Sequence, residues 1–500
     1  MSERDLEVFW HPCSQMRDYQ EFPPLEIVGA RGARLHLADG REVLDAISSW
    51  WCKSLGHGHP GVRARIEAQL ARFEHVIAAN TTNGPLVELC ERLLRMANGQ
   101  PAAAWGAGAE RGTEPAVRSP AHVSFDADVD AGAGAARGPF AKVFLADNGS
   151  TAVEIALKMA LQSQAQRGRT GRTRFAALAG GYHGETVGAL SVSDLGLYAD
   201  PYRALMFPVI KLGPLPDRSG PDDARWMDAS AEWPAIEAQL AAAADTLAAI
   251  IYEPILQAAG GMRLHSPDLL RRLRAFADRH GIYLIADEIA AGMGRLGTML
   301  AGELATGGTR GPVAGGGPAG DVAVWPDFVL LSKGLTAGFL PLSAVLTTND
   351  IYRDFDGDWA SGRAFLHSNT YTGNALGIAA ALGALDAYAG EGVLPHVAVH
   401  GQAMGAALVE VARRSPVLAR PRGLGMVAAV DLRRPDGGPI DPAVRAGRRV
   451  FLEGLKRGAL LRPLGDTLYL FPPLNCPPAD IAAMVEILAR SVAAAAGGWS

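Results

Sequence analysis

The stretch from Gly281 to Gly297, GIYLIADEIAAGMGRLG, constrains the fold of this chain more than any other. It begins with an unbroken apolar run, residues 282 to 286, and places Asp287 and Glu288 where that run stops. A short apolar run that leads into a glycine-rich turn is typical of a strand buried on both faces of a parallel sheet. Such sheets bind ligands beyond the carboxyl ends of their strands, so an acid at this point is well placed to hold a bound molecule by a cationic nitrogen.

A second apolar run, residues 328 to 331, ends in Ser332-Lys333-Gly334. One strand end therefore offers an acid, Asp287, and another offers a lysine, Lys333. Enzymes that use pyridoxal 5'-phosphate (PLP) need both groups, because the lysine holds the cofactor as a Schiff base and the acid pairs with its pyridinium nitrogen. The two strand ends together predict a PLP site.

Composition bounds the class of protein. A chain of 500 residues predicts more than one domain, and its 48% hydrophobic and 20% charged residues are ordinary for a soluble globular protein. The net charge of -5 gives no indication of a nucleic-acid partner, and no apolar run is long enough for a membrane span. The four cysteines are scattered and the N-terminus lacks a secretion signal, so we expect a cytoplasmic protein without a metal site.

Strand-like runs alternate with helical segments from about residue 142 to residue 346, which predicts an α/β fold with a mostly parallel sheet. We expect residues 76–385 to form this large domain. Residues 386–500 are expected to form a smaller α+β domain, which the N-terminal segment, residues 1–75, joins. Two Gly/Ala-rich stretches, at about 100–139 and 305–320, are interpreted as surface insertions of the large domain.

One helix of the N-terminal segment is expected over residues 61–75. Its apolar residues recur at helical spacing and share one face, which is typical of a helix packed on a core. They are Val62, Ile66, Leu70 and Phe73.

The turn Asp147-Asn148-Gly149-Ser150 leads into a long helix, at whose start Thr151 and Glu154 fit a capping box. Gly149 lets a ligand approach the backbone, and the first N–H groups of a helix attract an anion. The simpler interpretation is that Ser150 and Thr151 only cap the helix. Beside the predicted lysine and acid, phosphate binding at this turn is the favoured hypothesis.

Aromatic and basic side chains in three other segments could border the same site. Tyr182 lies in a glycine-rich loop after a strand, where an aromatic ring can lie over a planar cofactor. Of two adjacent tryptophans, Trp50 is equally well explained by core packing, and the other could line a pocket. Arg462 near a strand end could bind a carboxylate. Taken alone, Tyr182 is more often a plain loop aromatic and Arg462 a plain surface arginine.

Four motifs in this order resemble the class III (ω-type) aminotransferases of PLP fold type I. They are Glu253-Pro-Ile, Ala286-Asp-Glu-Ile, Ser332-Lys-Gly and Thr370-Tyr-Thr-Gly-Asn. The resemblance covers nearly the whole chain apart from the two insertions. Five stretches are similar to the biotin-pathway branch of that family: WHPCSQM at 10–16, SSWW at 48–51, DNGSTAVEIALKMALQ at 147–162, EPILQAAGGM at 253–262 and LLRPLGDTLYLFPP at 460–473.

The resemblance implies the reaction and the partners. It implies a PLP-dependent enzyme that converts 8-amino-7-oxononanoate to 7,8-diaminononanoate with S-adenosylmethionine as amino donor, in a homodimer with shared active sites. Lys333 would bond the cofactor and move the proton, and Asp287 would keep the pyridine nitrogen protonated.

The resemblance also implies a set of binding residues. The further residues around the cofactor are Gly149 and Ser150 at its phosphate, Tyr182 on its ring, and Thr370 at the phosphate from the partner subunit. The residues around the substrate are Trp51, Tyr182, Ser368 and Arg462, the last at the carboxylate of the keto acid.

One departure leaves the amino donor open. Cys13 stands where some members carry a substrate-contacting tyrosine, and a thiol cannot replace a phenol donor. The alternatives are the same step with lysine as donor, or another ω-amino substrate. A PLP-dependent aminomutase is remoter, because SSWW and the Arg462 segment match the biotin-pathway branch. A non-catalytic protein of this fold is disfavoured by the intact Lys333 and Asp287.

Overall fold

The computed structural model describes residues 2–106, 139–306, 324–497 and 499. Both predicted insertions therefore lie largely outside the described residues. The first one begins later than predicted, because Trp105 is buried and its backbone carbonyl accepts a hydrogen bond of 2.6 Å from Arg92 Nε. Its indole N–H also donates to the carbonyl of Gln100 at 3.0 Å. Residues 100–106 thus belong to the packed structure.

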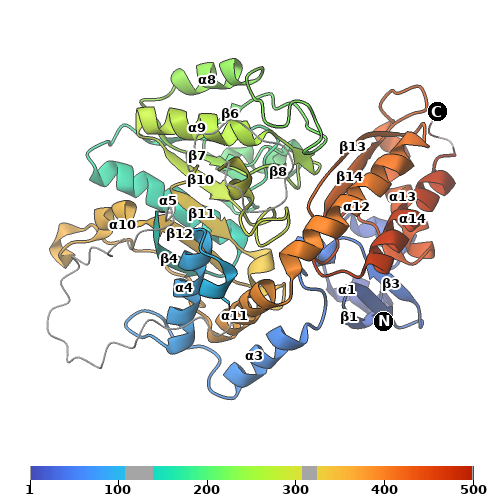
Figure 1. Ribbon diagram of the computed structural model, residues 1–500, viewed down its shortest axis with the longest axis horizontal. Helices are drawn as coiled ribbons and strands as arrows, with labels where there is room; N and C mark the ends of the chain where they lie inside the picture. Colours follow the sequence, from blue (N-terminus) through green and yellow to red (C-terminus); the bar gives the residue numbers. More distant parts are fainter. Residues whose placement is uncertain (1, 107–138, 307–323, 498, 500) are drawn as a thin grey trace.

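A seven-stranded sheet forms the centre of the larger part of the molecule (Figure 1). Its strand order is β4-β12-β11-β10-β7-β5-β6, and only β12 runs antiparallel to its neighbours. The strands are β4 (Phe140–Ala146), β5 (Arg174–Leu178), β6 (Val209–Leu212), β7 (Leu247–Tyr252), β10 (Tyr283–Asp287), β11 (Phe328–Leu331) and β12 (Ser343–Thr348). The predicted α/β fold with a mostly parallel sheet is confirmed.

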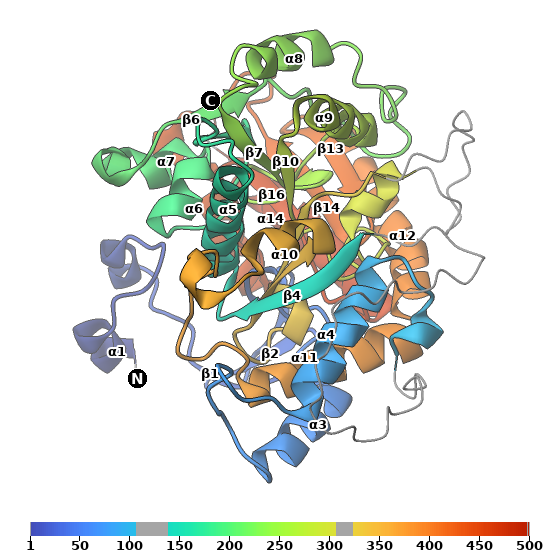
Figure 2. The ribbon, with the colours of Figure 1, turned by 90° about the vertical axis from the view of Figure 1, so that its left-hand side faces the viewer.

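Helices cover both faces of this sheet, which explains why β10 is apolar throughout (Figure 2). Tyr283 and Ile285 pack in the cluster that includes the helix α5 (Gly149–Gln166). Leu284 and Ala286 face the opposite cluster, which includes α8 (Trp233–Ala241) and α9 (Pro267–His280). Among the described residues, none of the helices combines the length and apolar character that crossing a lipid bilayer requires.

Two smaller sheets lie beside this layer, on the right in Figure 1. One has the order β1-β2-β3-β15, with β1 (Ile27–Arg31), β2 (Arg34–Leu37), β3 (Glu42–Asp45) and β15 (Ala459–Leu460). The other has the order β13-β14-β16, with β13 (Leu418–Leu424), β14 (Val427–Leu432) and β16 (Thr467–Leu470). Because β3 pairs with β15, the N-terminal segment is joined to the C-terminal part. The domain boundaries at 76 and 386 stay a prediction that this pairing supports.

The remaining elements connect these layers. The helices are α1 (Ser2–Val8), α2 (Ser48–Trp51), α3 (Pro60–Leu70), α4 (Gly84–Ala97), α6 (Val187–Val192), α7 (Gly196–Ala199), α10 (Asn349–Phe355), α11 (Ala375–Gly390), α12 (Val393–Arg413), α13 (Ala446–Lys456) and α14 (Pro478–Ala495). A short hairpin pairs β8 (Leu256–Gln257) with β9 (Arg263–Leu264). Short 3-10 helices lie at 16–20, 102–104, 200–205, 301–305, 333–336, 359–361 and 442–444.

The helix expected over residues 61–75 is shorter than predicted. It is α3, which ends at Leu70, and that side chain is exposed instead of sharing the buried face of Val62. The side chain of Gln69 donates a hydrogen bond of 2.8 Å to the carbonyl of Phe73. This bond supports a non-helical turn after the helix, so the apolar spacing overestimated its length.

Because β10 is buried, shortening one of its apolar side chains should lower the stability of the protein. Ile285 is fully buried, so Ile285→Ala is expected to lower the free energy of unfolding by about 2–5 kcal/mol through the lost apolar contacts and the cavity. Val399→Ala on α12 is the matched control, because Val399 is exposed. Urea unfolding followed by circular dichroism measures both. Equal midpoints for the two variants would contradict the assignment of β10 to the core.

Candidate active site

Three neighbouring strands of the large sheet each end in an ionisable side chain. Glu253 follows β7, Asp287 is the last residue of β10, and Lys333 follows β11. These strands are parallel neighbours, with Ala286 opposite Tyr252 and Asp287 opposite Leu330. The register brings all three groups to one edge of the sheet, as the sequence predicted for Asp287 and Lys333.

Lys333 opens a 3-10 helix with its own backbone at a φ of 42°, in the left-handed region. The backbone of the next residue, Gly334, is held in place, because its carbonyl accepts a hydrogen bond of 2.7 Å from the Tyr388 hydroxyl. Burial lowers the pKa of the Lys333 amine, against the opposing effects of Asp287 and Glu253. This environment favours the neutral amine more than water does.

Asp287 is held by two donors in a position only 3% exposed. His183 Nδ1 lies 2.7 Å from its Oδ2, and the backbone N–H of Ile289 donates to its Oδ1 at 3.1 Å. The remaining ring nitrogen of His183 is buried without a hydrogen-bond partner among the described residues. The histidine therefore serves the orientation of Asp287, with Nδ1 as the donor.

Glu253 is a second buried acid, for which the sequence motif suggested no role. Its two oxygens accept hydrogen bonds of 3.0 Å each, from the backbone N–H groups of Tyr182 and Ala258. Burial, reinforced by the charge of Asp287, raises the pKa of Glu253 to about 8. Glu253 thereby fixes the backbone of the loop that carries Tyr182. Its position directly after a buried strand, like that of Asp287, was the signal that could have identified it.

The Tyr182 loop lies against the start of α5. The Tyr182 hydroxyl donates to Glu185 at 2.9 Å, and the backbone N–H of Glu185 donates to Ser150 Oγ at 3.4 Å. A Cβ atom at Gly184 would stand 2.1 Å from Ser150 Oγ, so only glycine permits this approach. Tyr182, Gly149 and Ser150 are thus brought to one place.

The start of α5 differs from the predicted capping box. Asn148 is the N-cap, and its side chain accepts a hydrogen bond from the backbone N–H of Thr151 at 3.1 Å. Glu154 instead accepts from the backbone N–H of Gly188 at 2.8 Å, outside the helix. The helix begins at Gly149, because an extended asparagine is a good cap. The N–H groups of Gly149 and Ser150 are therefore in the first turn, where no helical carbonyl precedes them.

Of the two tryptophans, Trp51 is the buried one, so the core-packing interpretation of Trp50 is wrong. Trp50 is 36% exposed, and the Arg462 guanidinium lies over its ring, with Cζ 3.9 Å from the centroid. Trp51 is only 5% exposed, its indole N–H donates to the Tyr469 hydroxyl at 3.2 Å, and its ring centroid is 5.5 Å from Lys333 Nζ. Trp50 and Trp51 therefore form an aromatic wall of the site, and Arg462 packs on the Trp50 ring.

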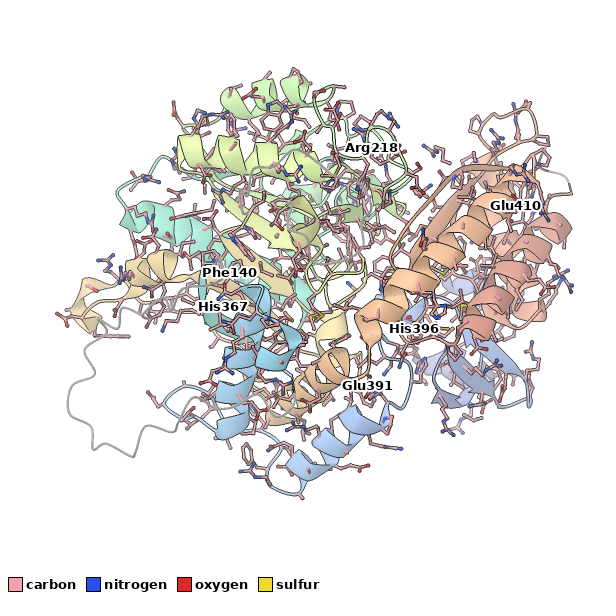
Figure 3. The ribbon with its side chains drawn as sticks, in the orientation of Figure 1. Phe140, Arg218, His367, Glu391, His396 and Glu410 are labelled. Carbon is pink, nitrogen blue, oxygen red and sulfur yellow. The ribbon has the colours of Figure 1, made fainter. Side chains whose placement is uncertain are left out.

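Two predicted residues are not brought to this centre within the chain. Ser368 and Thr370 are exposed, and no hydrogen bond or ring contact in the described part of the chain joins either to Lys333 or Asp287. Their neighbour His367, labelled in Figure 3, lies 2.9 Å from Lys158 Nζ on α5. The loop thus runs over the outer side of α5.

These groups fit the chemistry of PLP. The donor set consists of a desolvated amine, an oriented carboxylate, an aromatic ring and the open first turn of a long helix. The close approach at Gly184 leaves the backbone, without a side chain, beside that turn. A planar, basic, phosphorylated ring aldehyde requires this combination.

Comparisons with known proteins agree with this donor set. The family described as aminotransferase class-III matches residues 15–128 and 131–492. Two adenosylmethionine-8-amino-7-oxononanoate aminotransferases are similar over almost their full lengths. That of Synechococcus elongatus is 36% identical over 486 residues, which cover 96% of this chain and 98% of the relative. That of Geobacter sulfurreducens is 33% identical over 506 residues, with 99% and 97% covered.

Solved structures agree with the sequence relatives. The crystal structure of the adenosylmethionine-8-amino-7-oxononanoate aminotransferase of Methanocaldococcus jannaschii superposes with a TM-score of 0.81 at 27% identity, covering 99% of this chain and 98% of the other. A PLP-bound amine transaminase from an uncultivated Pseudomonas species superposes with a TM-score of 0.79 at 30% identity, covering 97% and 98%. This chain belongs to the class III aminotransferases.

Proposed function

We propose that the protein transfers an amino group to 8-amino-7-oxononanoate, giving 7,8-diaminononanoate for biotin biosynthesis, with PLP as cofactor and S-adenosylmethionine as donor. The observation that carries this proposal is the arrangement of Arg462 and Trp50 beside Trp51 and Lys333. It combines a carboxylate partner, an apolar wall and the reactive amine, which are the groups that an amphipathic keto acid requires. The names of the full-length relatives support the same substrate.

Three groups of the chain would hold the cofactor, and Lys333 would move the proton. PLP, when bound, supplies an electron sink that weakens the C–H bond next to the transferred amino group. Asp287, oriented by His183, would hold the ring nitrogen, Tyr182 would cover the ring, and the first turn of α5 would hold the phosphate. Lys333 is the residue that takes up and returns the proton at its Nζ, because burial favours its free amine.

Cys13 suggests a second candidate for the amino donor, because it lies beside the pocket: its carbonyl accepts a hydrogen bond of 3.5 Å from Arg462 Nη2. Burial and the nearby charge of Glu185 raise the pKa of the Cys13 thiol, and Tyr198 hydrogen-bonds to it. A neutral thiol is a weak hydrogen-bond donor, so this position offers little to a polar donor molecule. Lysine as the amino donor for the same step is therefore the second candidate.

A homodimer would complete the site. Ser368 and Thr370 are exposed on one chain, and exposed apolar side chains lie near them in sequence, at Leu366 and Tyr371. A second copy covering this loop would bury those side chains and bring the Thr370 hydroxyl to its phosphate. We place the dimer in the cytoplasm, with small-molecule substrates only.

The direct test is the donor half-reaction of the PLP-loaded protein, followed by the cofactor's visible absorbance. S-adenosylmethionine, lysine, glutamate and alanine are offered in parallel, and 8-amino-7-oxononanoate is then added. We expect S-adenosylmethionine to change the absorbance, the keto acid to restore it, and 7,8-diaminononanoate to form. A response to lysine alone changes the donor and keeps the step. A response only to other amines refutes the proposal.

Lys333→Ala is expected to show no turnover while remaining folded, as judged by circular dichroism.

The lowered pKa of Lys333 makes a prediction that does not depend on activity. The folded pKa is lowered by burial, whereas the unfolded lysine titrates at about 10.4. Between these values the unfolded chain binds a proton that the folded chain does not, so wild-type stability rises with pH there. Lys333→Met is therefore expected to have a higher thermal midpoint than wild type at pH 7, by a margin that shrinks towards pH 10.

Lys456→Met on α13 is the control for this measurement, because Lys456 is exposed. The difference in thermal midpoint between Lys456→Met and wild type should not shrink from pH 7 to pH 10. Both variants are measured in the cofactor-free form. A constant difference between Lys333→Met and wild type from pH 7 to pH 10 would show that Lys333 is not desolvated.

Arg462 should matter for one half-reaction only. Arg462→Ala removes a charge-assisted partner of the keto-acid carboxylate, so that half-reaction is expected to slow about 10- to 100-fold in kcat/KM. The donor half-reaction should stay within about threefold of wild type. Arg490→Ala, an exposed arginine on α14, is the control. Equal losses in both half-reactions would remove Arg462 from this role.

A further inference from the structure

The segment Ser48–Trp51, α2, has an unusual backbone. Its four residues have φ values of 50°, 45°, 69° and 73°, and none of them is glycine. L-amino acids disfavour this left-handed conformation, because Cβ approaches the following carbonyl oxygen. Four such residues in a row persist only where the surrounding structure holds them.

A single buried carboxylate holds the middle of this turn. Asp45, at the end of β3, is 0% exposed. Its Oδ1 accepts the backbone N–H of Ser49 at 2.9 Å, and its Oδ2 accepts the Ser49 hydroxyl at 2.7 Å. His57 Nε2 lies 2.9 Å from the same Oδ2. Burial raises the pKa of Asp45, but the hydrogen bonds from His57 and Ser49 outweigh it and lower the pKa overall, so the carboxylate stays ionised.

His57 is itself anchored to the N-terminal sheet. Its backbone N–H donates to the carbonyl of Gly32 at 2.8 Å, and Gly32 N–H donates to the carbonyl of His57 at 2.9 Å. Gly32 follows β1 in the same sheet that contains Asp45. The Asp45–His57 pair therefore ties the turn to a rigid sheet and not to a surface loop.

Two further hydrogen bonds fix the turn, one at its first residue and one two residues after its end. The Ser48 hydroxyl donates to the carbonyl of Phe471 at 2.7 Å, next to β16. Lys53 Nζ donates to the carbonyl of Gly338 at 2.8 Å, shortly after Lys333. The turn thus connects the C-terminal part of the chain with the segment that carries the reactive amine.

The left-handed turn decides where the two tryptophans point. It places the Trp50 ring against Arg462 and the Trp51 ring near Lys333, from adjacent residues. A right-handed turn of the same length would direct both side chains elsewhere, because Cα–Cβ directions follow the sign of φ. The aromatic wall and the orientation of Arg462 depend on this conformation.

We infer that Asp45 and His57 are positioning residues, which hold the Ser48–Trp51 turn left-handed and so set the pocket for the keto-acid chain and carboxylate. The inference rests on the proposed function, since it assigns the keto acid to Arg462. Asp45 and His57 touch no reacting group. They act through Trp50, Trp51 and Arg462.

Steady-state and half-reaction kinetics of the PLP-loaded protein test this inference. Asp45→Asn and His57→Leu are expected to raise KM for 8-amino-7-oxononanoate about tenfold, through a small displacement of the pocket. The donor half-reaction should stay within about threefold of wild type. His57→Gln should restore the wild-type KM, because its amide N–H can donate to the same carboxylate.

His59→Gln is the matched control. His59 lies in the same loop, and its Nε2 is 3.0 Å from Glu391 Oε2, a residue that follows α11 and is labelled in Figure 3. It contacts a carboxylate in the same way but does not hold the turn. Its KM for the keto acid should equal that of wild type.

Two variants of Ser49 distinguish the effect of backbone strain from that of the lost hydrogen bond. They also test the inference if Asp45→Asn fails to fold. Ser49→Gly and Ser49→Ala both lose the hydroxyl, but only glycine adopts a φ of 45° freely. Ser49→Gly is expected to keep a KM near wild type, and Ser49→Ala to raise it.

Two outcomes overturn the inference. One is an unchanged keto-acid KM in Asp45→Asn and His57→Leu, or in Ser49→Ala if those do not fold. The other is an equal loss in both half-reactions. Failure of the wild-type protein to aminate 8-amino-7-oxononanoate overturns the proposed function instead, which keeps the two failures apart.

Discussion

The hydrogen bond between His183 and Asp287 is the interaction on which the rest of the site depends. A carboxylate that is almost fully buried is costly unless donors satisfy it. Here a histidine side chain and a backbone N–H do so, and both oxygens are fixed. The negative charge is then available at one defined place on the sheet edge. Burial lowers the pKa of Lys333 and raises that of Glu253, and Asp287 opposes the first shift and adds to the second.

The large sheet supplies the reactive groups, but the smaller sheets supply the pocket. Lys333, Asp287 and Glu253 all follow strands of the large sheet. Arg462 follows β15, and the tryptophans follow β3, which pairs with β15. The site therefore forms where the two parts of the molecule meet (Figure 1). A binding site whose groups come from separate sheets can change its pocket without disturbing the strand ends that carry the chemistry.

The sequence predicted what is local and missed what depends on distant partners. The strands β10 and β11 and the placement of Asp287 and Lys333 follow from apolar runs and the residues at their ends. The predicted capping box at Thr151 is wrong, because Asn148, three residues earlier, caps the helix instead. The core-packing alternative for Trp50 is wrong, whereas Trp51, expected to line the pocket, lies near Lys333. The exposure of Trp50 could not be predicted, because the left-handed turn depends on Asp45 and has no signal of its own in residue type. No spacing rule pairs His183 with an acid 104 residues away.

The loop that carries Ser368 and Thr370 is exposed in the single chain, away from the start of α5 that would hold the phosphate. The first three residues of α5, 149–151, provide backbone N–H groups and hydroxyls but no cationic side chain for the phosphate. A dianionic phosphate held by one helix start would remain open to water, which weakens every hydrogen bond to it. A second copy that places the Thr370 loop over this turn would add a hydroxyl donor and exclude water in one step. If the proposed dimer forms in this way, cofactor binding and assembly would stabilise each other, since a ligand that binds only the assembled state favours that state.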